Sequence, residues 1–176
     1  MIRGLMRHGS MITIKTYNSI FMKKIIFLDF DGVMVTDRYQ EQLMTSGSPL
    51  RDEHGVKFDP VCAENLRRII NNTDADVVVT STWKMEMGLD GIRKMWSDRD
   101  LPDKVIGITP DIDILHRGNE IKTWLGRQTG TVRYAIIDDC PILDFFRKEQ
   151  LPFLFKVDER TGLDEETANR IIEHLK

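Results

Sequence analysis

Short apolar runs alternate along this chain with longer stretches in which apolar residues recur every three or four positions. The short runs are rich in Ile, Val and Phe and end at Asp, Gly or Thr, which is typical of buried strands. The longer stretches have one apolar side, which predicts amphipathic helices. The pattern predicts strands at 25–28, 76–80, 105–108, 134–137 and 153–157, and helices at 60–72, near 89–96, at 118–125, from 141 and after 164.

Strands that alternate with helices build a parallel sheet between two helical layers. We therefore expect a three-layer, Rossmann-like α/β fold with a central sheet of about five strands. Right-handed crossover connections then bring the carboxyl ends of the strands to one edge of the sheet. Residues 36–59 carry Gly47, Pro49 and Gly55 and have no sustained periodicity, so a loop excursion is predicted there.

The composition is that of a soluble globular protein, with 41% hydrophobic and 30% charged residues. A net charge of −3 gives no electrostatic argument for a nucleic-acid-binding protein as a whole. Cys62 and Cys140 lie far apart and predict no disulfide framework, which favours a reducing, cytoplasmic location. No apolar run reaches the roughly 20 residues of a membrane-spanning helix, so no membrane partner is expected.

The start of the chain differs from the remainder because residues 1–21 include basic side chains and no acid. We expect residues 1–21 to be an N-terminal extension, non-native or disordered, with an added strand at 11–14. Residues 22–176 are then expected to form a single domain. A basic, acid-free segment is also typical of an organelle transit peptide, which is the alternative interpretation.

Polar side chains gather where three of the predicted strands end: Asp29 and Asp31 after the first, Thr80 and Ser81 after the second, Asp138 and Asp139 after the fourth. Because these ends share one edge of the sheet, we expect the clusters to meet there, where open α/β sheets bind ligands. Two carboxylates held this close need a cation between them, or one of them must be protonated. Mg²⁺ fits, because it takes oxygen ligands and usually accompanies phosphate. The pattern predicts phosphoryl transfer with an aspartate nucleophile.

The run Asp-Phe-Asp-Gly-Val at 29–33, with the later hydroxyl and acidic clusters, resembles the motifs of the haloacid dehalogenase (HAD) superfamily of phosphohydrolases. The resemblance covers residues 24–176 and implies an HAD-like catalytic domain with a minimal cap or none. It implies a Mg²⁺-dependent phosphatase with Asp29 as the nucleophile, Asp31 as the general acid and base, and Thr80 as a phosphoryl ligand. The implied metal ligands are Asp29, Asp31 through its backbone carbonyl, Asp138 and Asp139.

The basic residue that steadies the phosphoryl charge is marked less sharply in the sequence. Arg117 stands at the start of the helix before the fourth strand, where the family places this residue, and is our first candidate. Lys84 and Lys122 are the alternatives, and any of the three could be a solvated surface charge. Ser81 and Gly32 complete the expected phosphate-binding set, Gly32 because it lets a ligand approach the backbone.

A narrower resemblance links the chain to a small capless subgroup related to phosphatase-like domains of RNA-repair proteins; it is carried by residues 80–84, 105–110, 117–121 and 137–139. A site without a lid is open. The expected partner is therefore a phosphorylated substrate, either macromolecular, such as a nucleic-acid end or a protein, or a nucleotide.

Two further hypotheses belong to other classes of protein. A receiver-like signalling module also holds a phosphoryl group on an aspartate of a five-stranded α/β sheet, but it carries its acidic pair on the first strand. A non-catalytic phosphoryl- or metal-binding module would keep the fold, and the complete set of acids argues against it. Trp83, Trp96 and Trp124 have aliphatic neighbours and are expected in the core rather than as stacking surfaces.

Overall fold

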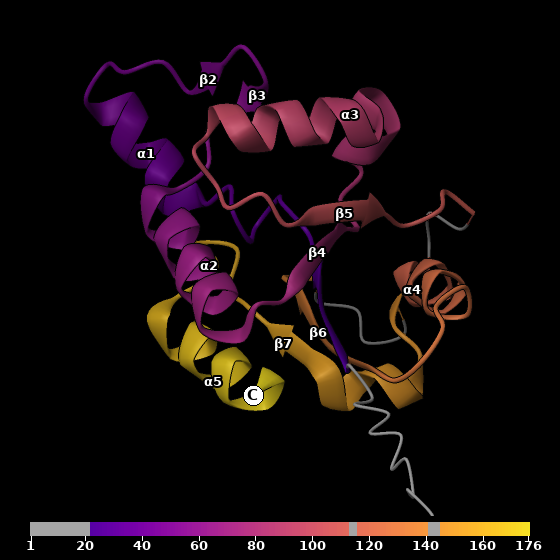
Figure 1. Ribbon diagram of the computed structural model, residues 1–176. Helices are drawn as coiled ribbons and strands as arrows, with labels where there is room; N and C mark the ends of the chain where they lie inside the picture. The colour runs from indigo at the N-terminus through magenta and orange to yellow at the C-terminus, as the bar shows by residue number, and fades with distance from the viewer. Residues whose placement is uncertain (1–21, 113–115, 141–144) are drawn as a thin grey trace, which may run out of the picture.

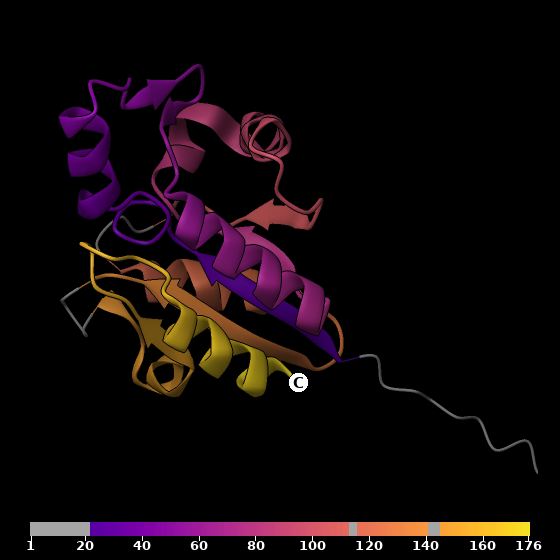
Figure 2. The same ribbon diagram turned by 90° about the vertical axis from the view of Figure 1, so that its left-hand side faces the viewer.

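The computed structural model describes residues 22–112, 116–140 and 145–176 (Figures 1 and 2). Its main sheet has five strands: β1 (Lys23–Leu28), β4 (Asp76–Val79), β5 (Val105–Ile108), β6 (Val132–Asp138) and β7 (Leu154–Lys156). The helices are α1 (Asp37–Thr45), α2 (Pro60–Thr73), α3 (Trp83–Asp98), α4 (Arg117–Leu125) and α5 (Glu165–Leu175), with a 3₁₀ helix η2 (Lys148–Phe153). The extension expected at 1–21, its strand at 11–14 and the helix start expected at 141 lie outside the described residues.

Strand β1 lies at the centre of the sheet and pairs in parallel with β4 on one side and β6 on the other. Its side chains alternate between two cores. Ile26 and Leu28 face α2, α3 and α5, whereas Ile25 and Phe27 face α4. Figure 1 shows α4 on the opposite side of the sheet from α2 and α5. Burial on both faces explains the uninterrupted apolar run of β1. The predicted parallel sheet with helices on both faces is confirmed.

The strand order also separates this chain from a receiver-like module. The sheet runs β5-β4-β1-β6-β7, which is 3-2-1-4-5 when its strands are counted along the chain. Receiver-like modules share the flavodoxin-like order 2-1-3-4-5, in which the first strand is not central. The receiver hypothesis is therefore wrong on topology.

The loop excursion predicted for residues 36–59 is wrong, because this segment contains regular secondary structure. It forms α1 and a small hairpin of β2 (Arg51–Asp52) and β3 (Gly55–Val56). Helix α1 is capped by Thr36, whose side chain accepts a hydrogen bond from the Tyr39 amide, but it buries only Leu43. A helix with one buried residue leaves no apolar periodicity to detect, which is why the sequence pattern missed it.

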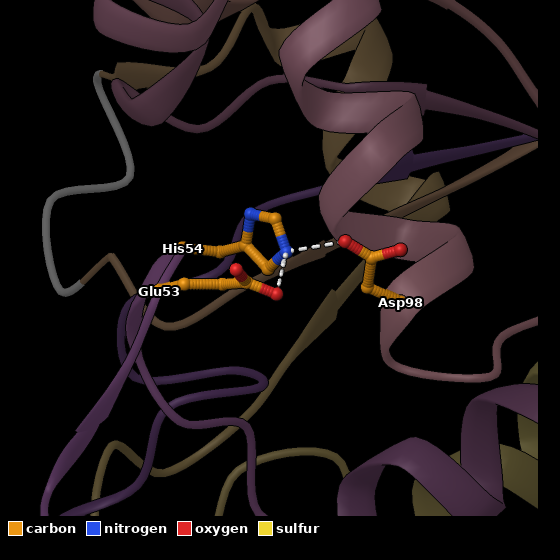
Figure 3. A group of neighbouring side chains, drawn as sticks. All are labelled: Glu53, His54 and Asp98. Carbon is orange, nitrogen blue, oxygen red and sulfur yellow. Dashed lines mark hydrogen bonds and ion pairs between the residues drawn. The ribbon is translucent and has the colours of Figure 1, made fainter.

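The hairpin is fastened to the far end of α3 by charged side chains. Arg99 donates to both carboxylate oxygens of Asp52, at 3.1 and 2.9 Å, and to the Val56 carbonyl oxygen at 3.0 Å. At the hairpin turn, His54 Nε2 lies 2.7 Å from Asp98 Oδ2 and 3.5 Å from Glu53 Oε1 (Figure 3). These contacts make the hairpin a minimal, well-anchored cover beside the carboxyl edge of the sheet.

Two other elements differ from the prediction. Helix α3 begins at Trp83 rather than near residue 89, and it is interrupted at Gly88, whose positive φ of 61° breaks the regular helix. In the described part of the segment after 141, η2 replaces the expected α-helix; Pro152 lies inside it and has no amide hydrogen to donate. None of the helices in the described ranges is long and apolar enough to cross a membrane.

Candidate active site

Residues that directly follow neighbouring strands line up across the carboxyl edge of the sheet. The Asp29 amide donates to the Ile137 carbonyl oxygen at 3.1 Å and thereby continues the pairing of β1 with β6. The Thr80 amide donates to the Leu28 carbonyl oxygen at 2.9 Å and continues the pairing of β4 with β1. Sheet register therefore places Thr80 and Asp138 on either side of Asp29.

Three carboxylates converge at this edge. One oxygen each of Asp29, Asp138 and Asp139 lies within 4.8 Å of the other two. Asp29 is 6% and Asp138 is 1% exposed, so both carboxylates are withdrawn from bulk water. The Asp29 carboxylate accepts a hydrogen bond from the Phe30 amide at 2.8 Å, and Asp138 accepts one from the Cys140 amide at 2.9 Å.

Arg117, the first residue of α4, supplies the positive charge at the centre of this group. Its Nη1 donates to Asp29 Oδ2 and to Asp138 Oδ2, and the Phe145 ring covers the guanidinium at 5.3 Å from Cζ to the ring centroid. Burial by itself lowers the pKa of Arg117, but the two carboxylates raise it above its ordinary value, so the guanidinium stays charged.

One guanidinium does not balance three carboxylates. Burial raises the pKa of Asp138, and the Arg117 charge only partly opposes this. Burial and the neighbouring Asp29 charge also raise the pKa of Asp139. The group therefore carries excess negative charge, and an all-oxygen donor set of this kind fits a hard divalent cation such as Mg²⁺.

Gly32 makes room for the third carboxylate. Its φ is +67°, and an added Cβ would lie 2.1 Å from Asp139 Oδ2. Real side chains cannot approach that closely, so only glycine at this position leaves Asp139 where it joins the other two aspartates. The Gly32 amide donates to the Val35 carbonyl oxygen at 2.9 Å, which closes the turn after β1.

Thr80 carries a buried polar atom with no partner in the described protein. The residue is 2% exposed, and its Oγ1 makes no hydrogen bond. With Lys84, Arg117 and Glu120 it lines a small space next to the aspartates. Buried hydroxyls nearly always have a partner, so this one is free to donate to a group that enters the space.

Because Thr80 Oγ1 has no partner in the described protein, we expect an unusual outcome for Thr80→Val, which removes the hydroxyl and keeps the side-chain shape. Because no hydrogen bond is lost, we expect the free energy of unfolding to stay the same or to rise by about 1 kcal/mol. Any activity on phosphate esters should fall by about 10²-fold in kcat/KM. Urea denaturation and steady-state kinetics measure the two quantities.

Thr73→Val is the matched control for this variant. The Thr73 hydroxyl is also buried, but it donates to the Ile69 carbonyl oxygen at 2.7 Å, so its removal should lower the free energy of unfolding without affecting activity. A Thr80→Val variant that loses as much stability as Thr73→Val would contradict the idea that Oγ1 is unpartnered in the free protein.

The remaining candidates from the sequence divide into those near this group and those away from it. Lys84 is buried and pairs with Glu120, while its Nζ also donates to Thr109 Oγ1 at 2.9 Å. Ser81 Oγ accepts a long hydrogen bond, 3.4 Å, from the Trp83 amide at the start of α3. Lys122 is exposed, and within the described residues no hydrogen bond or ion pair joins its side chain to the aspartates.

Asp31 points to a different neighbour from the other acids. Its carboxylate is not among the three that converge; its Oδ2 accepts a hydrogen bond of 3.0 Å from Trp83 Nε1. Partial burial and the Asp29 charge raise the pKa of Asp31, whereas the Trp83 hydrogen bond and Arg117 lower it. Asp31 also lines a pocket of about 440 Å³ between the β2–β3 hairpin and the first turns of α3.

Three side chains of this region were not singled out by the sequence analysis. Trp83 packs against the core as expected, but its indole N–H also contacts Asp31, which the sequence analysis did not predict; its place directly after the hydroxyls at 80–82 was the available signal. Thr109 and Glu120 complete the buried network around Lys84. Thr109 follows β5 at the same edge as Thr80, so counting all strand ends would have included it.

Comparison with known proteins returned one family. The family model described as HAD domain in Swiss Army Knife RNA repair proteins matches residues 25–168, which is most of the chain. Searches of curated proteins and of solved structures returned no match.

Proposed function

Because the chain belongs to the family of HAD domains in Swiss Army Knife RNA repair proteins, we propose that it is a Mg²⁺-dependent phosphohydrolase acting through an aspartyl-phosphate. The family membership supports an HAD-type phosphohydrolase at the level of the superfamily. The observation that carries the finer proposal is the convergence of Asp29, Asp138 and Asp139 within 4.8 Å, beside Arg117.

In the proposed first step, a carboxylate oxygen of Asp29 attacks phosphorus and the bond from phosphorus to the leaving oxygen breaks. Asp31 gives its proton to that oxygen, so the alcohol leaves neutral. In the second step, water attacks the phosphorus of the aspartyl-phosphate and passes a proton to Asp31. Inorganic phosphate departs, and the Asp29 carboxylate is restored.

Charge on the phosphoryl oxygens needs donors and cations around it. The Thr80 hydroxyl is available because it has no other partner, and Arg117 reaches the nucleophile directly. Lys84 lines the same space, but its charge is paired with Glu120, so Arg117 is the basic residue that we assign to the phosphoryl group. Asp29, Asp138 and Asp139 are the side chains that would hold Mg²⁺, which neutralises phosphoryl charge when bound. The expected contribution of the Asp31 backbone carbonyl stays a prediction.

The substrate proposal is a phosphorylated nucleic-acid end. The RNA-repair description of the family supports it, and so does the pocket beside Asp31, whose volume of about 440 Å³ lies in the range of small-ligand sites. A leaving alcohol must touch the general acid, and this pocket is lined by Asp31 itself. Nucleotides and phosphoproteins stay as alternatives.

The test is phosphate release by the purified chain from p-nitrophenyl phosphate with Mg²⁺, compared with the same reaction in EDTA. We expect turnover that requires the metal. A panel of 3′- and 5′-phosphorylated oligonucleotides, nucleotides and sugar phosphates then ranks substrates by kcat/KM. Metal binding by calorimetry without any turnover would favour the non-catalytic binding module instead.

A further inference from the structure

The Trp83 ring packs against apolar side chains, but its polar edge faces Asp31, the proposed general acid. Its Nε1 donates to Asp31 Oδ2 at 3.0 Å. The ring is held on several sides: it packs edge-on against Phe30, with centroids 5.6 Å apart, and tilted against Phe58 at 6.1 Å. On the hairpin side, an added Cβ on Gly55 would lie 3.3 Å from the ring.

The indole N–H can only donate, so the oxygen that it contacts must act as an acceptor. The bond therefore engages Oδ2 and leaves Oδ1 as the oxygen that can face a substrate. We propose that Trp83 is a positioning residue: it fixes the orientation of the Asp31 carboxyl group and keeps Oδ1 directed for exchange with the leaving oxygen. This inference rests on the proposed function, in which Asp31 protonates the leaving oxygen.

A purely structural role accounts less well for this hydrogen bond. Asp31 is exposed, so water can satisfy its carboxylate, and a bond to it adds little net stability. Trp96 offers the contrast within the same chain. Its ring is buried, and its Nε1 donates to the Pro102 carbonyl oxygen at 2.7 Å, a backbone partner far from the carboxylates.

The anchored β2–β3 hairpin explains how Trp83 can hold the Asp31 side chain in one orientation. Arg99 lies over Phe58, with Cζ 4.2 Å from the ring centroid, and it also holds Asp52 and Val56 of the hairpin. The indole is therefore enclosed between the core and an anchored hairpin. A ring with little freedom can hold an otherwise mobile carboxylate in one direction, which is what positioned proton transfer requires.

The experiment compares Trp83→Phe with Trp96→Phe on two classes of phosphate ester. Phenylalanine keeps an aromatic ring, removes the donor and shortens the side chain, and Trp96→Phe makes the same change away from Asp31. We compare kcat/KM, which reports the steps up to release of the leaving group. For an alkyl phosphate, whose leaving oxygen needs a proton, Trp83→Phe should lower kcat/KM by about 10- to 100-fold. For p-nitrophenyl phosphate, whose leaving group needs none, the change should be under about threefold.

A double-mutant cycle with Asp31→Asn separates positioning from packing. If Trp83 acts through Asp31, Trp83→Phe should lower alkyl-phosphate kcat/KM no further once Asp31 is asparagine. Trp83→His supplies a rescue, because its Nε2–H overlays the indole Nε1–H in the five-membered ring and should return the alkyl-phosphate kcat/KM to near the parent value. If Trp83→Phe melts well below Trp96→Phe, Trp83→His still tests the inference: it removes more of the ring but keeps the donor, so a loss on alkyl phosphate as large as in Trp83→Phe would overturn it.

Several results would overturn the inference. They are an equal loss on both ester classes, additive effects in the cycle, and a loss in Trp96→Phe as large as in Trp83→Phe. Failure of the unmodified chain to hydrolyse either ester would instead refute the proposed function, so the two failures are distinguishable.

Discussion

Replacing Asp29 by asparagine is expected to abolish phosphate release, with a loss of about 10⁴-fold or more in kcat. An amide oxygen is a poor nucleophile and cannot form the acyl-phosphate linkage. The folded state should survive the change, because asparagine Oδ1 can still accept the Phe30 amide hydrogen bond, and Arg117 keeps its partner Asp138. Phosphate release with Mg²⁺ and thermal melting are the measurements.

The control for this variant is Asp90→Asn, which makes the same chemical change at an exposed aspartate of α3 and should leave turnover intact. Acid-quenched phosphoprotein provides a second readout, since a covalent intermediate should be trapped in the parent chain and not in Asp29→Asn. Normal turnover by Asp29→Asn would rule out the assigned nucleophile, whatever the other residues do.

The main sheet was predictable because its central strands are buried on both faces over most of their length. In β1 the four residues 25–28 are all buried and apolar, and the end of the strand is marked by the first acid, Asp29. Helices α2 and α5 were predictable for a related reason. Each has one apolar side and a capping aspartate, Asp59 and Asp164, whose side chains accept hydrogen bonds from amides in the first turn.

The elements that were missed are those whose stability comes from distant partners. The β2–β3 hairpin has only two residues in each strand, and Arg99, far along the chain, holds it. Helix α1 buries too little to leave a pattern. No local sequence signal contains these tertiary contacts, so residues 36–59 resembled a loop.

The candidate site likewise has one part that the sequence predicts and another that depends on distant side-chain contacts. Sheet register alone brings Asp29, Thr80 and Asp138 together, and a register can be inferred once the strands are known. The partners of the basic residues could not be inferred in this way. Whether Arg117 or Lys84 contacts the aspartates depends on side-chain packing, and here Arg117 does so while Lys84 pairs with Glu120.

Gly32→Ala should remove Mg²⁺ binding although it replaces none of the metal-ligating side chains. Two effects combine at this position. A left-handed φ of +67° strains any residue with a Cβ by about 1–2 kcal/mol, and the new methyl group overlaps the Asp139 carboxylate. Asp139 must turn away, so the three-carboxylate group loses a member. In the parent chain, Mg²⁺ at 100 times its dissociation constant should add about 2.7 kcal/mol of stability; in Gly32→Ala this gain should vanish, together with phosphatase activity.

Gly47→Ala separates the clash from the backbone strain. Gly47 has the same φ of +67°, but an added Cβ there meets nothing within 4 Å. This control should therefore lose similar stability from strain while keeping the full rise in melting temperature on addition of Mg²⁺. The comparison is decisive because both variants make the same substitution at the same backbone angle. If Gly32→Ala kept its Mg²⁺-dependent rise, Asp139 would not be needed for the metal, and the three-carboxylate site would have to be redrawn around Asp29 and Asp138.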